Sequence, residues 1–168
     1  MADARAIRRL IQYRAWADKL TFDAVAALPP GEATKERRTL FKTILGTLNH
    51  NYLIDRVWQA HLEGRDHGFS ARNLLLHSDL AELWEVQQAA HRWYADYAAA
   101  QSDAALDQVV NFRFISGVAG AMTRADILTH VVNHGSYHRG WVAEMFFDVP
   151  AKNPSTDIPD FVAATGPR

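Results

Sequence analysis

The chain has no cysteine among its 168 residues. Disulfide bonds, thiolate metal ligands and a cysteine nucleophile are therefore excluded, and any thiol in its chemistry must come from another molecule. An excess of one charge is also lacking, because the formal net charge is -1. Binding of nucleic acid needs a concentrated basic surface, so no nucleic-acid partner is expected.

Long hydrophobic runs are absent as well. No stretch approaches the roughly 20 apolar residues of a membrane span, and the charged N-terminal segment has no apolar signal core. We therefore expect a cytoplasmic protein with no membrane partner. The length and the hydrophobic fraction of 48% are typical of one globular domain, predicted to span residues 1–168.

Hydrophobic spacing predicts four long helices, and strand signals are scarce. The expected helices cover residues 3–28, 39–62 and 78–100, and the fourth runs from a capping box at residues 123–126 to about Phe147. Residues 63–77 form a long second connection, residues 106–120 form an extended hairpin or an irregular loop, and the C-terminal segment holds at most a short helical turn around Phe161. The pattern predicts an all-α four-helix bundle, in which sites are built from facing helices.

Two histidines occupy core positions of the fourth predicted helix. His134 and His138 stand where the helical stripe requires apolar residues, so both rings point inward and both can reach one ion at about 2.1 Å. His130 lies about 12 Å along the axis from His138, so we assign it a position beside the site or at the surface. Two buried imidazoles one turn apart would otherwise need separate hydrogen-bond partners, which favours a metal site.

A third protein ligand must come from another helix, because catalytic metal sites commonly have three. His50 is the best candidate because it stands in the middle of a helix, on an apolar stripe. His91 and His61 are the next candidates, whereas His67 and His77 fall in the polar loop. The pair on the fourth helix lacks the adjacent glutamate of the H-E-x-x-H signature, so a zinc peptidase is not expected.

Other residues of the fourth helix have two interpretations each. Arg139 is predicted either to bind a carboxylate or phosphate of a substrate or to form a surface ion pair. Tyr137 and Asn133 either support the metal ligands or only pack at the boundary. Ser136 lies within a helix with no assignable acid and base, so a serine hydrolase is disfavoured. No catalytic residue is assigned.

Two segments resemble the DinB/YfiT-like family of metal-binding helical bundles: HVVNHGSYHRG, residues 130–140, and TLNHNYLIDRVW, residues 47–58. The resemblance implies that His50, His134 and His138 are the metal ligands. It also implies an up-down-down-up four-helix bundle that is commonly a homodimer. Trp141 departs from the glutamine that often follows histidine-arginine-glycine in the family, which puts the family's substrate contacts in doubt here.

A three-histidine site indicates a class of chemistry. Three neutral imidazoles leave the charge of a divalent ion uncompensated, so a bound water or thiol loses its proton more readily. Zinc or nickel suits imidazole ligands best. The family includes S-transferases and isomerases that depend on low-molecular-weight thiols, and this resemblance favours a metal-dependent enzyme that joins such a thiol to a small electrophile. The alternatives are a metal-dependent hydrolase and a non-enzymatic metal-binding or stress-response bundle.

Overall fold

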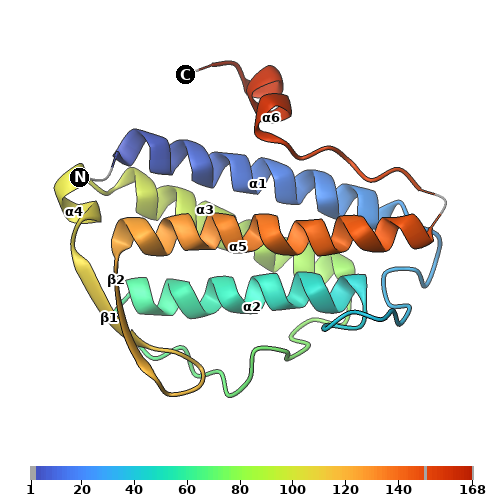
Figure 1. Ribbon diagram of the computed structural model, residues 1–168, viewed down its shortest axis with the longest axis horizontal. Helices are drawn as coiled ribbons and strands as arrows, with labels where there is room; N and C mark the ends of the chain where they lie inside the picture. The colour runs from blue at the N-terminus through green and yellow to red at the C-terminus, as the bar shows by residue number, and fades with distance from the viewer. Residues whose placement is uncertain (1–2, 150, 168) are drawn as a thin grey trace.

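The computed structural model describes residues 3–149 and 151–167, which are mostly helical (Figure 1). The long helices are α1 (Ala4–Ala26), α2 (Ile44–Leu62), α3 (Leu80–Ala99) and α5 (Arg124–Met145). The short elements are α4 (Asp103–Leu106), the 3-10 helix η1 (Phe146–Asp148), α6 (Ile158–Thr165) and the strands β1 (Val109–Arg113) and β2 (Ala119–Thr123). The all-α prediction is thus confirmed at the level of fold class, with a small sheet added.

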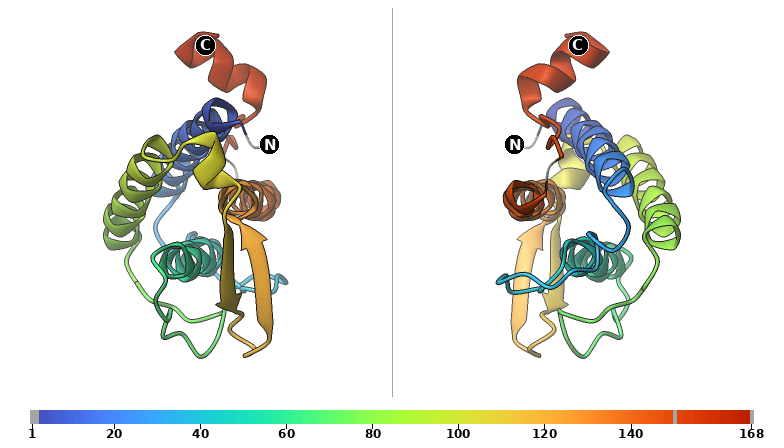
Figure 2. Two further views of the ribbon diagram at one scale, coloured as in Figure 1. Left: turned by 90° about the vertical axis from the view of Figure 1, so that its left-hand side faces the viewer. Right: turned by 90° about the vertical axis from the view of Figure 1, so that its right-hand side faces the viewer.

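The four long helices pack around one core. α2 contacts α5 and α3, and α1 contacts α3 and α5. Figure 2 shows the hairpin on the side of the bundle away from α1, while α6 projects beyond α1 on the opposite side. In the described part of the chain, no helix is both long enough and apolar enough to cross a membrane.

The second helix begins at Ile44, so its predicted start at residue 39 is wrong. The hydroxyl of Thr43 accepts a hydrogen bond from the Gly46 N–H and caps the helix at that point. Phe41 therefore lies in the preceding turn and not on a helical stripe. A Cβ at Gly46 would collide with the carbonyl oxygen of Phe41, so this glycine allows the turn to approach the helix closely.

Residues 109–123 resolve the open choice between a hairpin and an irregular loop. β1 and β2 pair antiparallel, and Gly117, with a φ of 84°, lies in the turn between them. A turn is also expected at Gly120 from the sequence, but this prediction is wrong: Gly120 lies in β2 opposite Phe112. The ring of Phe112 occupies the space that a side chain at Gly120 would need.

The other helix boundaries differ from prediction by a few residues, apart from α6. Asp79 and not Ser78 caps α3, and the predicted capping box of Thr123 and Asp126 opens α5. α6 has eight residues and is longer than the single turn expected. Its stability comes from Phe161, which is buried against α1.

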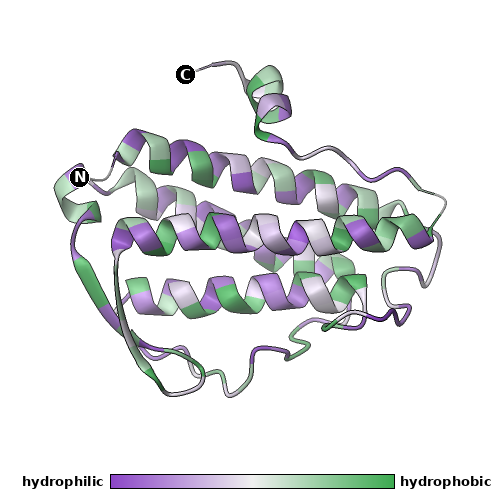
Figure 3. Ribbon diagram, viewed as in Figure 1, coloured by the Kyte–Doolittle hydropathy of each residue, from purple (hydrophilic) through white to green (hydrophobic). Residues whose placement is uncertain are grey.

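Two hydrophobic clusters form the core, one toward each end of the bundle. Trp58 and Ile127 belong to the cluster near the hairpin, and Leu83 and Val142 belong to the other. Figure 3 shows hydrophilic segments interrupting the hydrophobic ones along the long helices. Several polar side chains are buried where the clusters meet: Arg14, Asp18, His50, Asp55, His91, His138 and Arg139. A polar layer therefore crosses the middle of the bundle.

Candidate metal centre

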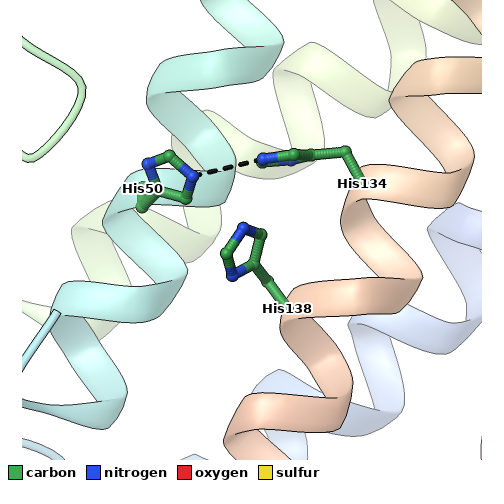
Figure 4. A group of neighbouring side chains, drawn as sticks. All are labelled: His50, His134 and His138. Carbon is green, nitrogen blue, oxygen red and sulfur yellow. Dashed lines mark hydrogen bonds between the residues drawn. The ribbon is translucent and has the colours of Figure 1, made fainter. Parts of the chain in front are cut away.

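Three histidines from two neighbouring helices face one another in the polar layer. His50 comes from α2, and His134 and His138 come from successive turns of α5. Each ring offers one nitrogen to a common space, and these nitrogens lie within 4.8 Å of one another (Figure 4). His50 and His138 are each 4% exposed, while His134 is half-buried. The structure thus brings together the three residues selected from the sequence.

A backbone carbonyl fixes the ring of His50. Its Nδ1 lies 2.6 Å from the carbonyl oxygen of Arg72, which can only accept a hydrogen bond. Nδ1 therefore carries the proton and donates it, and the lone pair of Nε2 faces the common space. Histidines that bind metal commonly donate their other N–H in this way.

The spacing of the nitrogens fits a shared cation. Nε2 of His50 lies 3.2 Å from Nε2 of His134. Two nitrogens bound to one ion at about 2.0 to 2.1 Å, at a tetrahedral angle, lie about 3.3 Å apart. Two facing lone pairs at this distance repel each other unless a proton or a cation lies between them. The donor set and its geometry therefore fit a divalent metal ion.

Burial lowers the pKa of all three imidazoles, because the charged form loses its hydration. The pKa of His134 falls to about 2, with additional contributions from the rings of His138 and His50. The pKa of His138 falls to about 4 through burial and the proximity of His50. Burial also lowers the pKa of His50. The rings are neutral at pH 7, which is the state in which imidazole binds a metal.

The alternative third ligands lie elsewhere. Nε2 of His91 is 3.2 Å from a carboxylate oxygen of Asp18, on the far side of the polar layer. The ring of His61 packs against Trp58 and Phe112. Neither residue joins the group of three, and His67 and His77 do not join it either.

His130 lies beside the site, as its position along the helix indicates. Its ring centroid is 5.6 Å from that of His134 and 5.0 Å from that of Trp58. Burial lowers its pKa. The residue belongs to the wall of the cavity described below and not to the three converging imidazoles.

Arg139 forms an ion pair, which was one of its two predicted roles, but the pair is buried and not at the surface. Its Nη1 donates to Asp18 at 2.8 Å, and its Nη2 donates to the hydroxyls of Tyr13 and Ser136. The reason is its place on the face of α5 that packs against α1. Ser136 in turn donates to the carbonyl oxygen of Val132, a local helix contact. Tyr137 and Asn133 are exposed.

Sequence reasoning missed a group that we call the ionic cluster: Arg14, Asp18, Asp55, His91 and Arg139. Arg14 donates to Asp55 at 2.7 Å and lies 3.4 Å from Asp18. Its Nη1 also donates to the carbonyl oxygen of Val131 at 2.6 Å. The guanidinium packs against Gly135, where a Cβ would lie only 2.7 Å from its Nε. The ionic cluster therefore contacts the turn of α5 that carries His134.

The imidazoles open onto a cavity of about 850 Å³. Its walls include six large apolar or aromatic side chains from α2, α5, the hairpin and the turn before α2: Phe41, Ile54, Trp58, Phe114, Tyr137 and Trp141. None of the lining residues that the structure describes is acidic. Helical periodicity placed Ile54 and Trp58 on the second predicted helix but did not separate cavity wall from core, and Trp141 was marked only by its departure from the family's glutamine.

The sequence profile of the DinB family matches residues 1–168. The chain belongs to the DinB family. A curated member of the DinB family, the protein DinB of Bacillus subtilis strain 168, is 28% identical to it over 153 residues. The matched region covers 89% of each of the two chains. The family inferred from the histidine-bearing segments is therefore confirmed.

Proposed function

We propose that His50, His134 and His138 hold one divalent metal ion, zinc or nickel, and that this DinB-family protein is a metal-dependent enzyme. The reaction is the transfer of a low-molecular-weight thiol to a small electrophile. The main observation in favour of an enzymatic function is that the three converging imidazoles form part of the wall of a large cavity. Structural metal sites have all positions filled by protein ligands, whereas catalytic sites keep a position open.

The charge around the site supports activation of a nucleophile. The three neutral imidazoles would hold a divalent ion with no described acidic residue in the cavity wall, and the uncompensated charge of that ion would lower the pKa of a thiol or water there. In the transfer, the sulfur of the thiol forms a bond with the electrophilic carbon. The bond from that carbon to its leaving group breaks, the leaving group takes the electron pair, and the thiol proton passes to solvent.

The chain's own residues orient the ligands and restrict access by water. Arg72 fixes the ring of His50 through its carbonyl oxygen. Phe41 stacks on His50 with ring centroids 4.1 Å apart, and Trp141 lies against His138 at 4.9 Å. These apolar rings cover one side of the site, so polar contacts on that side are stronger than they would be in water.

A metal-dependent hydrolase and a non-enzymatic metal-binding bundle are the competing functions. Water in place of the thiol would give hydrolysis at the same site, so the nucleophile distinguishes these two reactions. A bundle that uses its ion only for stability does not need ligands beside a cavity. Membership of the family supports the remaining parts of the proposal, which are an up-down-down-up helix order, a homodimer, a cytoplasmic location and a small-molecule substrate.

Metal content tests the site directly. Protein purified without a histidine tag and reconstituted with zinc should contain one equivalent by elemental analysis. His50→Ala, His134→Ala and His138→Ala should each lose it, whereas His77→Ala, a change in the loop outside the group, should retain it. Equal zinc content in all five proteins would contradict the proposed ligands.

Activity is tested with a panel of electrophiles and low-molecular-weight thiols. The zinc-loaded protein should consume thiol and electrophile in equal amounts, and His134→Ala should not accelerate the reaction above the rate without protein. Product formation without thiol consumption would favour the hydrolase. Metal binding with no turnover of either kind would favour the non-enzymatic bundle.

A further inference from the structure

The cavity extends past the imidazoles in two directions along α2 and α5. These helices are antiparallel, since His50 faces His138 while Trp58, two turns later on α2, faces His130, two turns earlier on α5. On the His138 side, aromatic rings line the cavity: the ring centroid of Trp141 lies 5.8 Å from that of Phe41 and 5.4 Å from that of Tyr137. The side of the cavity toward the hairpin is lined by a different set of residues.

On that side, residues from three elements form what we call the hairpin arm: Ile54, Trp58, His61, Phe114 and His130. The ring of Phe114 lies 6.4 Å from that of Trp58 and at 90° to it. Phe114 is 44% exposed, whereas Trp58 is 5% exposed. Trp58 is therefore a fixed wall of the hairpin arm, and Phe114 lies at its opening to solvent. His130 connects the arm to the imidazole site through its contact with His134.

The hairpin arm has no charged partner to offer a ligand. Among the described lining residues of the whole cavity, Arg72 alone carries a permanent charge, and its side chain is exposed. A charged molecule entering the arm would lose hydration without gaining an opposite charge. A flat apolar molecule would gain contact with Trp58 and Phe114, because aromatic pairs prefer edge-to-face or offset arrangements.

We propose that the hairpin arm binds the aromatic part of an uncharged electrophile and holds its reactive carbon beside the three imidazoles. The part of this inference that concerns the reaction rests on the proposed function. The binding part depends only on the walls of the arm. The cavity volume of about 850 Å³ lies toward the upper end of the range for sites that hold drug-sized ligands, so it leaves room for a thiol beside the electrophile.

Calorimetric titration with three naphthalene probes tests the hairpin arm: 2-naphthylmethanol, naphthalene-2-sulfonate and 2-naphthylmethylammonium. Zinc-loaded and chelator-treated protein are titrated in parallel. We expect 2-naphthylmethanol to bind most tightly, and to bind with similar affinity in both forms. Retained binding by metal-free protein would support the arm even if the metal-dependent reaction failed. Absence of binding, or equal affinity for the three probes, would overturn the inference.

Matched variants locate the probe. Phe114→Ala should weaken 2-naphthylmethanol binding by about two- to tenfold, the range expected for one aromatic pair. Val118→Ala lies on the same hairpin outside the cavity wall and should not change the affinity, whereas Trp141→Ala, in the cavity wall on the opposite side of the imidazoles, should weaken binding less than Phe114→Ala does. An unchanged affinity in Phe114→Ala, or an equal loss in Trp141→Ala, would contradict binding in the arm.

Discussion

The imidazole site and the ionic cluster lie in the same polar layer, yet they are built in opposite ways. In the ionic cluster, two guanidiniums face two carboxylates, with each charge within 3.4 Å of an opposite one. In the imidazole site, three neutral rings turn nitrogens toward one another, and no acidic residue among the described ones lines the adjoining cavity. The charges of the ionic cluster are balanced, whereas the imidazole site would be stabilised by a bound cation.

The same burial has different electrostatic results in the two groups. Burial alone would raise the pKa of Asp18, but Arg139, His91 and Arg14 outweigh it and hold that pKa far below the ordinary value. At His134 burial acts with the neighbouring rings, and the pKa falls. The charged form is therefore favoured at Asp18, whereas burial raises the pKa of Asp55 in the same cluster, and the charged form is disfavoured at the imidazoles. Buried charge can serve structure where it is paired, and uncharged nitrogen donors can serve a metal.

The largest expected effect comes from breaking the ionic cluster. Asp18→Asn removes the carboxylate that Arg14 and Arg139 share, and leaves two guanidiniums in the core with one carboxylate. Loss of one partner from a buried ion pair costs about 3 to 5 kcal/mol of unfolding free energy. Urea denaturation measures this difference.

Asp23→Asn is the matched control for this measurement. Asp23 is on the same helix, but its ion pair with Lys19 is exposed, so its loss should cost less than about 1 kcal/mol. Similar urea midpoints for Asp18→Asn and Asp23→Asn would show that the ionic cluster adds little to stability.

Zinc bound at the imidazole site should raise the unfolding free energy of the protein by somewhat less than Asp18→Asn lowers it. Free zinc at about 100 times its Kd raises the unfolding free energy by about 2.7 kcal/mol, provided that zinc binds only the folded state. His134→Ala should lose this increment. His91→Gln, which alters the ionic cluster, should keep the increment even where its stability without metal is lower. An equal loss of the zinc-dependent rise in unfolding free energy in both variants would show that zinc binding depends on the ionic cluster as well as on the imidazoles.

Sequence reasoning succeeds for the imidazoles where local periodicity decides the outcome. The spacing of His134 and His138 places both on one helix face whichever helix packs against it. The convergence of His50 depends on the pairing of α2 with α5, which spacing alone does not specify. His50 was chosen over His91 and His61 because it stands in the middle of a helix on an apolar stripe, and the family resemblance agreed with that choice. The start of α2 was missed because the cap at Thr43 outweighs the apolar residues before it.

The ionic cluster was not visible in the sequence for a related reason. Arg14 and Asp55 are separated by 41 positions, and a charged residue on an amphipathic helix ordinarily indicates an exposed face. Arg139 was assigned to the surface or to a substrate on the same grounds. Arg14 and Asp18 stand four residues apart on α1, and only packing of α1 against α5 brings Arg139 to Asp18 inside the bundle.

Gly135 and Gly140 allow a finer test of the contact between the two polar groups. Gly135→Ala places a Cβ 2.7 Å from Nε of Arg14, whose guanidinium is held by Asp55 and cannot move freely. Overpacking of this kind costs about 1 to 3 kcal/mol, against a gain of up to about 1 kcal/mol in helix propensity. We expect a net loss of unfolding free energy and weaker zinc binding, because His134 is the adjacent residue.

Gly140→Ala is the control on the same helix. In the described structure, apart from the local backbone, no atom lies within 4 Å of its added Cβ, so this change should stabilise the protein by up to about 1 kcal/mol. Thermal unfolding and zinc titration of the two variants separate the clash from the propensity. A stabilised Gly135→Ala variant with unchanged zinc affinity would show that the ionic cluster does not position His134.

The pH dependence of the metal-free protein tests the electrostatic difference between the two polar groups. The pKa of His138 is about 4 when folded, below the ordinary 6.5, so the unfolded chain binds more protons between these values. Stability should therefore fall as pH decreases from about 6.5 toward 4, and the lowered pKa of His134 acts in the same direction.

Asp18 contributes stability that is lost only below its ordinary pKa of 3.8, so this carboxylate should not produce the slope between pH 4 and 6.5. Replacing His134 and His138 together by glutamine should make the dependence measured by urea denaturation between pH 4 and 6.5 less steep, with the lowered pKa values of His50, His61 and His130 giving the remaining slope, whereas His77→Gln should leave it unchanged. An equally steep dependence in the double variant would assign the proton uptake to groups outside the imidazole site.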